Sequence, residues 1–234
     1  MQTKVRNFVI SSLIAVIYFL GVLKIPYYLN RFFKGTYIGN NIVGVLLTAN
    51  FIFAILLFVF LKKVNINSIS KNVDKEGFKK AVLLAVVSGV LVFVGGKFTD
   101  YVLKLFKYVV IDDTIRIRNI LENNNLMFFY MVLAVPVVQE LVYRNVIFGN
   151  LYDIYEGGYE CVRFLTPAFL TGVIFCIFSS SLTLPTFVKV IYTSSVLSFV
   201  YYKTKRIETS ILANVVYNLC VILFALFTKP TSVL

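Results

Sequence analysis

The chain has 234 residues, of which 59% are hydrophobic and only 15% are charged, and its mean hydropathy is +0.85. Soluble domains are nearer half apolar and a quarter charged, so this composition excludes an ordinary water-soluble fold. The net charge of +12 comes from lysines and arginines that flank apolar runs. Such cations favour contact with an anionic lipid surface, and no basic groove-binding motif points to a nucleic-acid partner.

The apolar residues form runs that are long enough to cross a bilayer as helices. The sequence predicts an all-α, polytopic transmembrane helical bundle. We expect about seven spans, near residues 8–23, 42–61, 81–98, 126–149, 162–178, 184–202 and 207–227.

Lysine and arginine bias predicts the orientation of these spans. With seven spans, the N-terminus, the loop 62–80 and the turn 203–206 share one side, and they carry two, six and three cations. We therefore expect a multi-pass protein of the cell membrane with a cytoplasmic N-terminus. The C-terminus then lies on the opposite side.

The segment 99–123 mixes apolar and charged residues and has two interpretations. Tyr101, Leu105 and Tyr108 are near helical spacing, which suits either an interfacial helix or a continuation of the third span into the headgroups. From Asp112 onward, we expect a polar link that reaches Asn125.

The chain contains no histidine, which removes the commonest general base and the commonest metal ligand. Its three cysteines, Cys161, Cys176 and Cys220, are scattered without metal-ligand spacing and indicate buried free thiols. We therefore expect neither a metal nor another cofactor.

Glu140 and Arg144 are the most unusual residues of the fourth expected span, because ionisable groups at bilayer depth are costly. They are four residues apart and share one helical face, so we expect an ion pair within the helix. Other polar groups occur at corresponding depths: Gln139, Ser179, Asn214 and Asn218. Taken singly, such residues commonly form hydrogen bonds between membrane helices.

Taken together, these residues resemble the motifs of the CPBP family of intramembrane proteases, also called the CAAX-protease, bacteriocin-processing or Abi family. Residues 139–144, QELVYR, resemble its E-E-x-x-x-R motif. Phe175 to Ser179 falls at F-x-x-x-H, and Asn214 to Asn218 falls at H-x-x-x-N. The stretch 191–219 resembles the last two core helices.

The resemblance divides the chain into three parts. It implies N-terminal transmembrane helices and an interfacial segment over 1–125, and a CPBP-type four-helix core over 126–228. A short tail follows at 229–234.

The departures from the family motifs bear on activity. In the family, the first glutamate and a histidine activate water, while a second histidine and an asparagine support the oxyanion. Here Gln139, Ser179 and Asn214 replace the first glutamate and both histidines, whereas Glu140, Arg144 and Asn218 persist.

None of the replacements is a useful base at neutral pH, which peptide hydrolysis needs. The guanidinium beside Glu140 also favours its ionised form and weakens it as a base. A Ser–Lys pair that uses Lys189 is a remote alternative. These degenerate positions predict no catalytic residue.

The expected function is therefore that of a pseudoprotease. It would act as a scaffold or regulatory subunit of another membrane or cell-envelope protein, such as a cell-wall enzyme or a sensor kinase, in a bacterium. A residual intramembrane endopeptidase and a bacteriocin self-immunity membrane protein are the alternatives. The family resemblance implies both regulators and immunity proteins among bacterial members.

Overall fold

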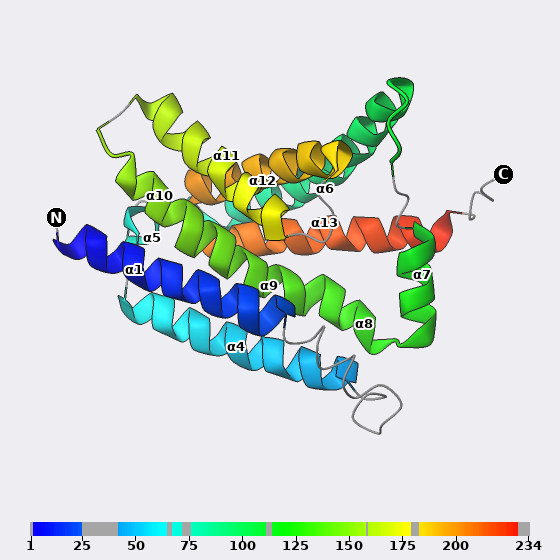
Figure 1. Ribbon diagram of the computed structural model, residues 1–234, viewed down its shortest axis with the longest axis horizontal. Helices are drawn as coiled ribbons and strands as arrows, with labels where there is room; N and C mark the ends of the chain where they lie inside the picture. The colour runs from blue at the N-terminus through cyan, green and yellow to red at the C-terminus, as the bar shows by residue number, and fades with distance from the viewer. Residues whose placement is uncertain are drawn as a thin grey trace.

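A computed structural model describes residues 2–24, 42–64, 67–71, 76–110, 114–157, 159–178 and 183–228. All regular structure in these residues is helical, and the long helices lie alongside one another in a bundle (Figure 1). The predicted all-α fold is confirmed. The bundle consists of α1 (Gln2–Ile17), η1 (Tyr18–Lys24), α4 (Ile42–Val64), α5 (Ser68–Lys71), α6 (Phe78–Leu105), α7 (Thr114–Asn123), α8 (Leu126–Phe129), η2 (Tyr130–Ala134), α9 (Val135–Glu140), η3 (Leu141–Phe148), α10 (Gly149–Ile154), α11 (Glu160–Phe178), α12 (Leu184–Thr204) and α13 (Ile207–Phe227), in which η marks a π-helical turn.

Six helical runs of the described residues are long and apolar enough to cross a membrane. They are Gly44–Val64, Phe78–Leu105, Leu126–Ile154, Glu160–Phe178, Leu184–Thr204 and Ile207–Phe227, and a shorter apolar helix covers Arg6–Gly21. They match the expected spans in order and position. The first expected span is an apolar helix that is shorter than the other six, so the described residues contain six of the seven expected spans and this shorter helix.

The segments richest in lysine and arginine meet at one end of the bundle. Asn67, which precedes α5, donates a hydrogen bond to the backbone oxygen of Asn145 at 2.6 Å, and Arg206 Nε donates to the Glu76 carbonyl at 2.9 Å. The N-terminus lies toward the same end as α5 and α10 (Figure 1). This arrangement agrees with the predicted sidedness of the loops. That this end of the bundle faces the cytoplasm stays a prediction.

Small residues allow the helices of the C-terminal half to pack closely on α6. A Cβ added at Gly89 of α6 would lie 2.5 Å from the Ala213 carbonyl oxygen of α13. A Cβ at Gly172 of α11 would lie 2.8 Å from Ile191 of α12. Such close backbone approach is typical of membrane helices, whose association depends on packing and hydrogen bonds.

The segment 99–123 contains a helix where we expected a polar link. α6 continues to Leu105, as one of the two interpretations predicted, and α7 then runs from Thr114 to Asn123. Ile117 and Leu121 are one turn apart on α7, and both are buried against Ile222 of α13. Because its polar residues occupy the other face, α7 reads as a loop by composition but forms an amphipathic helix.

Candidate functional site

Glu140 lies at the end of α9 and is completely buried. Arg144, four residues on and 2% exposed, places its Nε 3.2 Å from Glu140 Oε2. The predicted ion pair is therefore present, although this Nε is not aligned for a hydrogen bond. An isolated buried charge is expensive, so the carboxylate needs further partners.

Helix α13 supplies those partners. Ser210 Oγ donates to Glu140 Oε2, and Asn214 Nδ2 donates to Glu140 Oε1 at 2.8 Å. Both carboxylate oxygens thus accept hydrogen bonds from side chains one turn apart on the same face of α13. Asn218 adds a further hydrogen bond to this network by donating from Nδ2 to Asn214 Oδ1 at 3.0 Å. The network joins α9 to α13 in the interior of the bundle.

The backbone changes its winding at this network. The run Leu126–Ile154 alternates α-helical and π-helical turns, and η3 begins directly after Glu140. All eight residues of η3 are buried, including Arg144 and Asn145. π-helical turns inside α-helices are frequent at functional sites, where they redirect side chains.

Gln139 has a different environment from its neighbour. Its side chain is half-buried and makes a hydrogen-bond contact with Tyr18 of η1, which is 1% exposed. Tyr18 packs edge-on against Tyr143, and Tyr143 packs edge-on against Phe175 of α11. The first motif position therefore contacts Tyr18, which belongs to an aromatic cluster from three helices.

The predicted site residues are thus only partly brought together. One network contains Glu140, Arg144, Asn214 and Asn218. Gln139 instead contacts Tyr18, and Ser179 lies outside the described residues. Next to Ser179, Phe178 stacks on Phe19 of η1 with ring centroids 3.6 Å apart.

Sequence reasoning missed Ser210 and Tyr18. Ser210 is one turn before Asn214, so the same helical face that indicated Asn214 and Asn218 could have included it. Tyr18 carries no comparable signal. Its role depends on the packing of η1 against η3, which the sequence spacing does not reveal.

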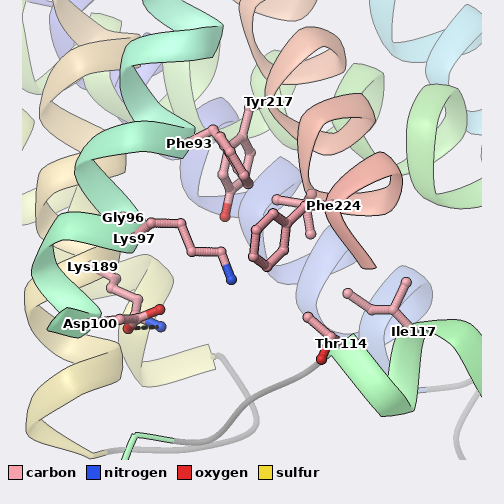
Figure 2. A pocket seen from close by; sticks show the side chains of 10 residues that line it. Phe93, Gly96, Lys97, Asp100, Thr114, Ile117, Lys189, Tyr217 and Phe224 are labelled. Atoms are coloured by element: carbon pink, nitrogen blue, oxygen red, sulfur yellow. Dashed lines mark ion pairs between the residues drawn. The ribbon is translucent and has the colours of Figure 1, made fainter. Parts of the chain in front are cut away.

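A second polar cluster lies near the other end of α13, where α6, α7 and α12 surround a cavity of about 110 Å³ (Figure 2). Lys189 forms an ion pair with Asp100, and Lys97 Nζ lies 4.0 Å from the centre of the Phe224 ring. A lysine that activates a serine must be within hydrogen-bond reach of that serine, whereas Lys189 is engaged by Asp100. This pairing argues against the Ser–Lys arrangement that uses Lys189.

The described residues contain no group of three or more His, Cys, Asp or Glu side chains that could hold a metal ion. Cys176 is buried, Cys220 is half-buried and Cys161 is exposed, so the expectation of buried thiols fails for Cys161. The absence of a cofactor stays a prediction.

Comparison with known proteins agrees with the motif resemblance. Residues 122–220 match the family model "Type II CAAX prenyl endopeptidase Rce1-like". The chain is 24% identical over 169 residues to "Putative membrane peptidase YdiL" of Bacillus subtilis (strain 168), a match that covers 69% of this chain and 65% of that protein. No solved structure matches the chain. Residues 122–220 are therefore an Rce1-like domain of the CAAX protease (CPBP) family, and the chain is a multi-pass membrane protein.

Proposed function

We propose that the chain is a non-catalytic member of this family, a pseudoprotease that acts as a scaffold or regulatory subunit of another integral membrane or cell-envelope protein. The observation that carries the proposal is the state of Glu140. It is the remaining carboxylate of the first motif, it is fully buried, and both of its oxygens accept hydrogen bonds from α13.

A general base must reach the proton that it removes, directly or through one water. The Glu140 carboxylate is instead engaged by Ser210, Asn214 and Arg144. These contacts hold the buried carboxyl group in place, which makes it a structural centre of the bundle. The cavity of about 110 Å³ beside α7 lies elsewhere and is lined by other residues.

The position of the missing glutamate supports the same conclusion. The Gln139 amide cannot accept a proton usefully, and it contacts Tyr18, whose ring packs against Tyr143. Asn214, at a histidine position of the motif, uses its amide as a donor to Glu140. The polar groups thus retain hydrogen bonding without the proton transfer that hydrolysis requires.

The residual endopeptidase is the second candidate, because Glu140, Arg144 and Asn218 persist at their motif positions and a relative is named as a putative membrane peptidase. Proteoliposomes that hold the purified chain would be incubated with a farnesylated CAAX peptide and with fluorogenic membrane-embedded peptides. We expect no cleavage above protein-free liposomes. Cleavage that disappears in Glu140→Gln but persists in Glu208→Gln, an exposed glutamate on α13, would establish a live protease instead.

The scaffold role needs a separate test. Affinity purification from native membranes should recover a membrane or envelope protein in constant ratio to the chain, and Gln139→Ala should recover it equally. This result is expected because the proposal gives Gln139 no part in binding the partner protein. If no protein co-purifies after cross-linking in intact membranes, the scaffold role fails, whatever the outcome of the protease assay.

A further inference from the structure

A groove of about 390 Å³ separates part of α6 from part of α12 at the lysine-rich end of the bundle. The two helices are in contact on the face of α6 opposite the groove opening, where buried Ala85 packs with Leu197, and further along, where Tyr192 OH donates to the Leu91 carbonyl at 2.9 Å. Toward their lysine-rich ends, apolar side chains line the space between them: Ala81, Leu83, Leu84, Val87 and Phe199.

The groove combines an apolar floor with charged groups at one end. Leu83 is 66% exposed and Phe199 is 46% exposed. Glu76, Lys80 and Lys203 also line the groove, so its charged residues sum to +1. The Glu76 carbonyl accepts a hydrogen bond from Arg206, which brings a further cation to this end.

A spanning helix places these two features at defined depths. Lys80 lies at the start of α6 and Lys203 at the end of α12, so both are at the membrane surface, whereas Val87 lies about 10 Å deeper at 1.5 Å per residue. The apolar part therefore meets acyl chains, and the lysines meet headgroup phosphates. An apolar partner helix would cover the apolar side chains of the groove but leave the two lysines without anionic partners.

We propose that this groove is a binding site for an anionic phospholipid, with one acyl chain along Leu83, Val87 and Phe199 and the headgroup phosphate between Lys80 and Lys203. Lysines at a membrane surface are attracted to anionic lipid by about 1 kcal/mol each, which is roughly fivefold in affinity. Two lysines on one headgroup therefore favour anionic over zwitterionic lipid by at most about 25-fold, and the Glu76 charge lowers this preference.

The test uses the full chain in nanodiscs that contain equal amounts of phosphatidylglycerol and phosphatidylcholine with identical acyl chains. The protein is then extracted into detergent, and the lipids that remain bound are counted by native mass spectrometry. We expect selective retention of phosphatidylglycerol. Lys80→Gln/Lys203→Gln should abolish the preference, and Val87→Trp, which fills the groove, should reduce retention of either lipid.

Two matched variants serve as controls. Lys62→Gln/Lys63→Gln removes the same charge from exposed positions at the end of α4, and Val90→Trp adds the same side chain on α6 outside the groove. Both should retain phosphatidylglycerol as the wild type does. Three outcomes would each overturn the groove as a specific lipid site. They are equal retention of the two lipids by the wild type, an equal loss of phosphatidylglycerol from the two double lysine variants, and no effect of Val87→Trp on retention.

Discussion

The two charged clusters of the bundle contain similar chemical groups in opposite environments. Glu140 and Arg144 are 0% and 2% exposed, and α13 engages both oxygens of the carboxylate. The side chains of Lys189 and Asp100 are 31% and 19% exposed and border a cavity. Burial and further partners, rather than the presence of opposite charges, decide how strongly a pair couples to the fold.

The first test of this difference concerns the depth of the two clusters in the membrane. Ser210 and Phe224 are about 21 Å apart along α13, so the clusters lie at different depths. In a cysteine-free background, Lys79→Cys and Lys104→Cys at the two exposed ends of α6 should label from opposite sides, with Lys79 cytoplasmic. The measurement is labelling by membrane-impermeant maleimide in intact and in inverted vesicles, and each cysteine should react in one of the two preparations and not in the other. Labelling of both from one side contradicts the predicted topology.

The largest energetic effect is expected at the buried pair. Glu140→Ala leaves Arg144 without its carboxylate in a low-dielectric interior and should cost about 3–5 kcal/mol of unfolding free energy. The double variant Glu140→Met/Arg144→Met should be milder, because it removes both charges. Thermal unfolding in detergent would measure both. Equal melting of the single and double variants would show that the pair does not stabilise the fold.

Sequence reasoning succeeded where the signal was local. The spans follow from apolar runs, and the Glu140–Arg144 pair follows from four-residue spacing on one helix. Tyr18 and Ser210 were missed because their roles depend on which helices are neighbours. α7 was missed because its composition is polar, although Ile117 and Leu121 bury one face. Long-range packing therefore limits what the motifs alone could predict about the site.

An intermediate effect is expected for the partners that α13 supplies. Ser210→Ala removes a hydrogen bond to a charged group and should cost about 1.5–3 kcal/mol, because Glu140 Oε2 then lacks that donor. Tyr143→Phe is the matched control, since its buried hydroxyl has no hydrogen-bond partner among the described residues. Denaturant unfolding in detergent should separate the two variants. If Ser210→Ala is as stable as Tyr143→Phe, water or another group replaces the hydroxyl.

The smallest effect is expected at the half-buried Lys189–Asp100 pair, and its size discriminates between the two environments. Asp100→Asn removes the charge that faces Lys189 but leaves both side chains in contact with solvent. Pairs with this exposure contribute up to about 1 kcal/mol, and salt screens them over about 8 Å at physiological ionic strength. The loss of stability should therefore shrink as salt is raised, whereas the loss in Glu140→Ala should persist. Unfolding of both variants at low and high salt measures this contrast. A large, salt-independent loss in Asp100→Asn would show that the second cluster is as strongly coupled to the fold as the first, and the distinction between the clusters would then fail.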